Sequence, residues 1–121
     1  MTSDSTEATV IGWDQLPGPI TTYLVAHARR DTGAALAAFT TDAVVTDEGR
    51  DHHGGAEIEA WLKISGDSYS YTTEFTGAST LAAASFDVVQ HLEGDFPGGV
   101  ADLHYRFTLE DGRISRLVIE P

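Results

Sequence analysis

The chain has 121 residues, of which 41% are hydrophobic and 21% are charged, and these values are ordinary for one globular domain with its own core. Its 7 basic and 19 acidic residues give a net charge of -12, so we expect neither nucleic acid nor an anionic membrane surface as a partner. Cysteine is absent, which excludes disulfides and thiolate chemistry and is typical of a cytoplasmic protein.

The N-terminal stretch MTSDSTEAT is polar and acidic, unlike a secretion signal or a transit peptide. No apolar run approaches the roughly 20 residues that a membrane helix needs. We therefore expect a flexible tail over residues 1–12 and a single domain over residues 13–121.

The first predicted helix runs from about Ile20 to Arg30. Pro19 suits its first turn, and Tyr23, Leu24 and His27 belong to one stripe at helical spacing. Because His27 lies one turn beyond Tyr23 on the same face, the two side chains could share a ligand.

A second helix is predicted from Ala34 to Thr40. Asp31 or Thr32 is expected to cap it, because both side chains can accept a hydrogen bond from a free backbone N–H. Its apolar spacing places Phe39 on the buried face.

The segment DAVVTDEGRDHHGGAEIEAW is the richest in chemical signals. A short apolar strand, Ala43 to Thr46, is followed at once by Asp47, and Gly54-Gly55 precedes a third helix from about Ala56 to Ile64 that carries Trp61. A carboxylate held beside bulky apolar side chains loses solvation, which raises its pKa toward neutrality. The segment therefore predicts a pocket with an acid or base in its wall.

His52 and His53 are adjacent in a segment that we expect to be a solvated loop. Neighbouring side chains rarely point at one metal ion, even with Asp47 and Asp51 nearby, so we expect no metal site.

After residue 67 the pattern changes to period two. This alternation predicts an antiparallel meander of four strands, over about Tyr69–Thr76, Leu81–Glu93, Val100–Leu109 and Arg113–Ile119. Three helices followed by such a meander indicate an α+β fold, with the helices packed on one face of a curved sheet.

The late strands carry polar side chains whose direction the pattern leaves open. Asp87 and His91 lie on one side of their strand, opposite Phe86. Asp102 and His104 likewise share one side of the next strand. These four side chains point either into the pocket or toward the outer surface. Both alternating sets of positions on these strands therefore carry residues able to take part in chemistry, as expected if both faces of the sheet are covered. This favours a homodimer formed by the outer face of the sheet.

The element order resembles the nuclear-transport-factor-2-like superfamily, and within it the SnoaL-like group, over about residues 16–121. The most specific parts are the FTTDAVVTDEG strand, the GGAEIEAW helix start and the closing strand DGRISRLVIEP. The resemblance implies a cone-shaped, curved antiparallel sheet wrapped around three N-terminal helices, a cystatin-like α+β barrel, and it also implies a homodimer. Because this superfamily contains several unrelated activities, the fold alone does not name the function.

Ketosteroid isomerase, one member of the superfamily, carries its general base in a segment similar to DAVVTDEG. The resemblance places that base on Asp47 and the oxyanion-stabilising tyrosine on Tyr23, with His27 beside it. The SnoaL-like cyclases place a base on a later strand, where Asp102 or Asp87 is the counterpart.

Motifs for nucleotide cofactors, zinc proteases and serine hydrolases are absent from the sequence. We therefore expect a cofactor-independent acid/base enzyme of isomerase, cyclase or dehydratase type that acts on an apolar or polyketide-like molecule. A non-catalytic ligand-binding or dimerisation module is the alternative. The expected pocket wall consists of Trp61, Phe39, Leu24, Tyr71, Phe86 and Tyr105.

Overall fold

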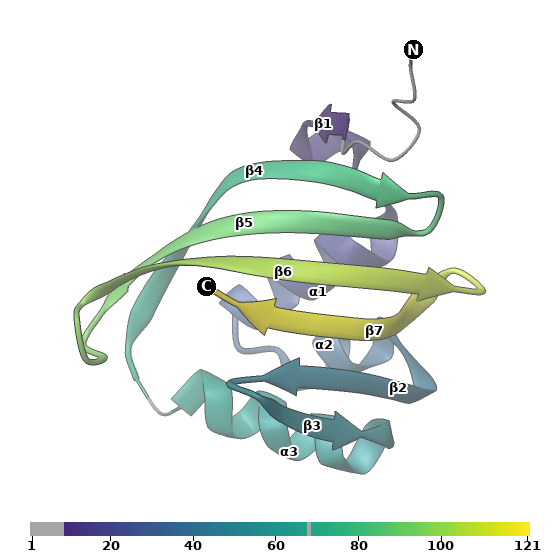
Figure 1. Ribbon diagram of the computed structural model, residues 1–121. Helices are drawn as coiled ribbons and strands as arrows, with labels where there is room; N and C mark the ends of the chain where they lie inside the picture. Colours follow the sequence, from purple (N-terminus) through teal and green to yellow (C-terminus); the bar gives the residue numbers. More distant parts are fainter. Residues whose placement is uncertain (1–8, 68) are drawn as a thin grey trace.

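The computed structural model describes residues 9–67 and 69–121. Over these residues the helices are α1 (Gly18–Ala28), α2 (Thr32–Ala37) and α3 (Gly54–Asp67), with a 3-10 turn, η2, at Trp13–Gln15. The strands are β1 (Thr9–Ile11), β2 (Phe39–Asp47), β3 (Arg50–His53), β4 (Tyr71–Ala82), β5 (Ser85–Gly94), β6 (Val100–Glu110) and β7 (Arg113–Glu120). The strands form one curved sheet, and the helices pack against its concave side (Figure 1). The expected α+β class is confirmed.

The sheet is mixed, which corrects the expectation of a purely antiparallel one. Its strand order is β1-β4-β5-β6-β7-β2-β3, so β1 and β3 are free edges and the barrel stays open. All neighbouring strands pair antiparallel except β2 and β7, which run parallel. A parallel pair needs a long crossover, here the chain from β2 through α3 and the meander, so no local turn signal announces it.

The second helix is shorter than predicted. The Asp31 side chain accepts a hydrogen bond from the Ala34 N–H at 3.1 Å, which confirms the expected cap. However, α2 ends at Ala37, and Phe39 begins β2, opposite Ile114 of β7. Phe39 is buried either way, because its side chain satisfies the apolar requirement of a helix face and of a strand equally well.

Residues 50–53 form strand β3, and the prediction of a solvated loop there is wrong. Glu48 and Gly49 both have positive φ, 54° and 76°, and make the two-residue turn that returns the chain from β2 to β3. A glutamate rarely adopts this conformation, so the hairpin signal was hidden in the sequence.

The boundary between β4 and β5 also differs from the prediction. β4 continues to Ala82, and the turn falls in the alanine run before Ser85, where the sequence offers no glycine or proline. Gly77, which resembles a turn signal, instead sits at an irregularity of the pairing between β4 and β5.

Strand β1 pairs with β4, with Val10 opposite Ser79. Residues 9–11 were assigned to the tail by the sequence pattern, and the first eight residues of that predicted tail lie outside the described residues. None of the helices in the described part of the chain is long and apolar enough to cross a membrane.

The late strands alternate as the period-two pattern predicts. Phe86, Val88 and Leu92 of β5 are buried on the concave face, whereas Asp87 and His91 point outward. The core between this face and the helices includes Ile20 of α1, Ile58 of α3, Phe107 of β6, and Ile114 and Leu117 of β7, all at most 1% exposed.

Candidate functional site

A cavity of about 880 Å³ opens between the helices and the concave face of the sheet. Its wall takes residues from α1, α3, β2 and the four strands of the meander. This volume lies in the range of small-molecule sites, which are mostly apolar clefts with a few placed polar groups. The predicted residues His27, Asp47, Trp61, Tyr71 and Tyr105 all line it.

Asp47 lies in the wall at the end of β2, opposite Ile119 of β7. The indole Nε1 of Trp61 donates a hydrogen bond to Oδ2 of Asp47 at 3.1 Å. Burial raises the pKa of Asp47, and the hydrogen bond from Trp61 opposes that rise because it stabilises the ionised form. The carboxylate is therefore oriented by one neighbour while its surroundings make it a stronger base.

Four aromatic rings form a chain behind and beside this carboxylate. Tyr23 stacks on His27 with ring centroids 5.6 Å apart, and His27 stacks on Trp61 at 6.1 Å. His52 of β3 contacts the same indole, at 5.9 Å. His52 was expected in a solvated loop, and only the pairing of β3 with β2 brings it against Trp61.

His27 lines the cavity from α1. Burial lowers the pKa of His27, and the Arg30 guanidinium lowers it further, so the neutral imidazole is favoured. A neutral imidazole can donate one N–H to a ligand and accept at its other nitrogen.

Tyr23 is fully buried and is not part of the cavity wall. Its ring makes edge contacts with Phe39 and Phe107, at centroid distances of 5.4 and 5.8 Å. Among the described residues its hydroxyl has no hydrogen-bond partner. Burial raises the pKa of Tyr23 strongly, and the charge of Asp47 adds to this, so Tyr23 is a neutral phenol with an unused donor.

Tyr71 of β4 and Tyr105 of β6 line the part of the wall formed by the sheet. Burial raises the pKa of Tyr105, and a hydrogen bond with Gln90 opposes the rise. Gln90 is the buried polar residue that the sequence reading missed, although it shares the parity of Val88 and Leu92 and was thereby marked as inward-facing.

The remaining predicted wall residues lie elsewhere. Leu24, Phe39 and Phe86 belong to the buried core and are not among the residues that line the cavity. Each occupies an apolar position of its element, and apolar spacing separates core from solvent but cannot separate core from cavity wall.

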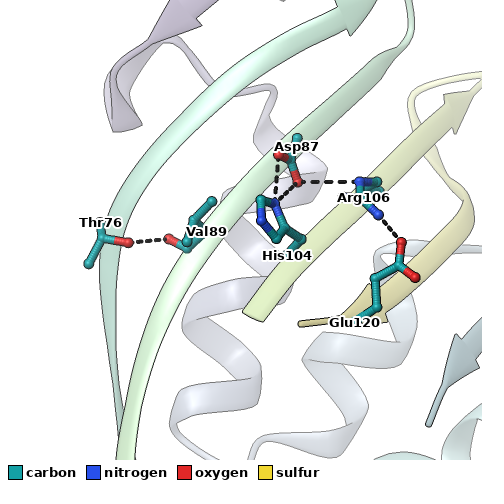
Figure 2. Close-up of polar contacts among 6 residues, drawn as sticks. All are labelled: Thr76, Asp87, Val89, His104, Arg106 and Glu120. Carbon is teal, nitrogen blue, oxygen red and sulfur yellow. Dashed lines mark hydrogen bonds and ion pairs between the residues drawn. The ribbon is translucent and has the colours of Figure 1, made fainter. Parts of the chain in front are cut away.

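The outer face of the sheet carries the four polar residues whose direction the sequence left open. His104 Nδ1 lies 2.9 Å from Oδ2 of Asp87, and Arg106 bridges Asp87 and Glu120 (Figure 2). His91 lies 2.7 Å from Asp102. Because Asp87 and Asp102 face away from the cavity, neither can serve as its base.

No group of three or more histidine, aspartate and glutamate side chains is arranged to hold a metal ion within the part of the chain that the structure describes. His52 and His53 alternate on β3, so they point to opposite sides of the strand.

Solved structures share this fold. A protein of Sinorhizobium meliloti described as a candidate polyketide cyclase is 34% identical, with 91% of this chain and 100% of that chain covered and a TM-score of 0.85. SalBIII, an epoxide hydrolase/cyclase-like enzyme of pyran ring formation in salinomycin, is 20% identical over 84% of this chain and 85% of its own, with a TM-score of 0.71.

A Catenulispora acidiphila protein with a ketosteroid isomerase-like fold, solved with trimethylamine, is 16% identical over 88% of this chain and 87% of its own, with a TM-score of 0.74. At this identity, as for SalBIII, the likeness concerns the fold alone. No protein-family model and no curated protein matches the chain at a significant level.

Proposed function

Because the chain belongs to the SnoaL-like group of the nuclear-transport-factor-2-like superfamily, we propose that it is a cofactor-independent acid/base enzyme acting on an apolar or polyketide-like ketone. One observation carries this proposal: a carboxylate with a raised pKa, oriented by an indole N–H, in the wall of a cavity of about 880 Å³. The relative at 34% identity, a candidate polyketide cyclase, motivates the ligand class.

Asp47 is the proposed base. It takes a proton from the carbon next to a ligand carbonyl, and the electrons of the broken C–H bond move to the carbonyl oxygen as an enolate. In a ketone with a β,γ double bond the dienolate takes the proton back from Asp47 at the γ carbon, which is isomerisation. In a ketone with a second carbonyl the enolate carbon attacks that carbonyl, and the alkoxide formed takes the proton back from Asp47, which is cyclisation. Neither route needs an oxidant or a reductant.

The developing negative charge on the enolate oxygen needs a hydrogen-bond donor. Tyr105 and His27 line the cavity and can donate directly. The ring of Tyr23 stacks on His27 and its hydroxyl has no partner among the described residues, and we propose that it supports the same charge.

β-Tetralone is a suitable probe because it is an apolar ketone with acidic protons. We expect the protein to accelerate exchange of its α-protons for deuterium above the buffer rate, as followed by NMR in D₂O. Asp47→Asn should abolish the acceleration and still bind the ketone. Asp42→Asn, an exposed acid on the same strand, is the matched control and should exchange like the parent.

A non-catalytic ligand-binding module is the second candidate. The position of Tyr23 favours this candidate. The isomerase resemblance implied that the Tyr23 hydroxyl reaches the ligand, whereas Tyr23 is fully buried and is not part of the cavity wall. Binding of β-tetralone in the cavity without any acceleration of exchange would establish this candidate and remove the enzyme.

We also propose that the protein forms a homodimer through the outer face of the sheet. The Asp87 side chain there is only 16% exposed, with His104 as a hydrogen-bond partner and Arg106 as an ion-pair partner, so this polar face can pack against a second copy without leaving an isolated buried charge. The open curvature of the sheet leaves this face free of helices (Figure 1).

A further inference from the structure

The part of the cavity wall that the structure describes carries acidic side chains and no lysine or arginine. Asp47, Glu48 and Glu120 lie in it, and none of the described residues that line it is a lysine or an arginine. Residues 1–8 and 65–68 contain no lysine or arginine in their sequence, so none of the chain's 7 basic residues can add a positive charge from there. A ligand anion would meet these carboxylates and no lysine or arginine among the described residues of the wall.

Four of the 7 basic residues lie outside the wall and have contacts of their own. Arg106 pairs with Asp87 on the outer face and with Glu120 at the cavity wall, and Arg116 donates to the carbonyl of Val44 at 3.3 Å. Arg30 and Lys63 border a smaller cavity of about 150 Å³ that shares His27 with the large one, and Arg30 donates to the carbonyl of the wall residue Tyr69 at 3.4 Å.

The wall is also aromatic on both sides. Trp61 lies on the helical side, and Tyr69, Tyr71, Phe96 and Tyr105 lie on the side of the meander. Phe96 makes edge contacts with Tyr69 and Tyr71, at centroid distances of 6.2 and 6.4 Å, so these rings form one cluster. The face of an aromatic ring carries negative charge density that attracts a cation.

We infer that the cavity takes an apolar ligand that carries an amine or quaternary ammonium cation, held between the Asp47 carboxylate and the aromatic faces of the wall. The inference rests on the proposed function, since it concerns the ligand of that same site. It narrows the ligand class from an apolar ketone to one with a positive charge.

The field of Asp47 reaches the opposite side of the cavity. Burial raises the pKa of Tyr71, the Arg30 guanidinium opposes that rise, and the Asp47 carboxylate adds to it. The Asp47 carboxylate likewise contributes to the raised pKa of Tyr105, after burial. Both phenols therefore stay neutral, and a cation between them and Asp47 would be attracted from both sides.

A bound cation is compatible with the proposed chemistry. Its charge would favour the ionised form of Asp47 and lower the raised pKa of that group. His27, with its lowered pKa, would stay neutral and add no repulsion.

Choline and two molecules of the same shape test the inference. In 3,3-dimethylbutan-1-ol a carbon replaces the charged nitrogen, and 3,3-dimethylbutanoate carries a negative charge instead. NMR titrations follow the Trp61 indole N–H in about 0.15 M salt, where the Debye length of about 8 Å screens the general attraction of the acidic chain for cations. We expect choline to bind about tenfold more tightly than the alcohol, and the carboxylate to bind most weakly.

Asp47→Asn should remove most of the preference for choline over the alcohol while leaving the affinity for the alcohol nearly unchanged. Asp42→Asn, outside the cavity, should keep the preference. Choline should also lower the pKa of Asp47 in an NMR titration, which a purely structural role of Asp47 would not produce.

The outcomes separate this inference from the proposed function. Equal binding of choline and the alcohol in the cavity, or tighter binding of the carboxylate, would overturn the cationic ligand class and leave the β-tetralone test untouched. Tight choline binding, together with binding of β-tetralone in the cavity and no acceleration of its exchange, would support the inference and overturn the enzyme.

Discussion

The indole N–H of Trp61 points at the carboxylate of Asp47, with 3.1 Å between Nε1 and Oδ2. Trp61 is 6% exposed and belongs to α3, whereas Asp47 ends β2, so this contact ties the helix to the sheet at the cavity wall. The hydrogen bond stabilises the ionised carboxylate and burial destabilises it, so the properties of the proposed base depend on the balance of these two effects.

Asp47→Asn should be at least as stable as the parent at neutral pH. The pKa of Asp47 in the folded state is raised above its ordinary value of 3.8, so its contribution to stability is greatest below that value and is lost as the pH rises through the folded pKa. Asparagine removes this loss and can still accept the Trp61 hydrogen bond. Urea unfolding at several pH values is the measurement, and a variant less stable than the parent at neutral pH would contradict it.

Trp61→Phe should raise the pKa of Asp47 further. Phenylalanine keeps most of the buried ring but lacks the N–H that favours the ionised carboxylate. NMR titration of the Asp47 carboxyl measures the change, and Trp13→Phe, at a ring that contacts Phe75 instead, is the matched control. An unchanged value would mean that the hydrogen bond does not hold in solution.

Trp61→Ala should lower the free energy of unfolding by about 3–5 kcal/mol, because it leaves a cavity where a large buried ring packed against His27 and His52. Chemical denaturation gives the difference. A loss below about 1 kcal/mol would show that the ring is peripheral to the fold.

Asp102→Asn should lower the pKa of His91. That pKa is raised by the Asp102 carboxylate, 2.7 Å from Nδ1, and by Glu93, 2.9 Å from Nε2. A raised histidine pKa stabilises the fold below the ordinary value of 6.5, and this contribution is lost as the pH rises through the folded value. NMR titration of the His91 ring is the test, with Asp42→Asn as control, and an unchanged pKa would contradict the pairing.

The parent protein should be a dimer in light scattering, at about twice the monomer mass of 13.0 kDa. His104→Glu places a carboxylate against Asp87 on the outer face and should give monomers that keep the parent circular dichroism spectrum. Thr22→Glu, an exposed change on α1, should stay dimeric. A parent that is monomeric at micromolar concentration would overturn the proposed interface.

The sequence alone predicted the elements whose side chains repeat over many residues. The stripe of Tyr23, Leu24 and His27 follows from helical spacing, and the shared side of Phe86 and Val88 follows from alternation along β5. These features are local, because each depends on the period of one element and on the requirement that one face be apolar.

The placement of Asp47 in a cavity wall was also predictable, since an apolar strand ended directly in an acid next to a helix with a large aromatic residue. The partner of that acid was not. The resemblance assigned Tyr23 to an oxyanion, and no local pattern marked Trp61 as the hydrogen-bond donor to Asp47.

Only the tertiary structure decided the relations between distant parts of the chain. The parallel pairing of β2 with β7, the contact of His52 with Trp61, and the separation of Phe86 in the core from Tyr105 in the wall all depend on how elements pack. The local sequence pattern predicts that a side chain is buried, because burial follows the apolar period of its helix or strand. What it is buried against depends on contacts between residues far apart in sequence, which no local period records.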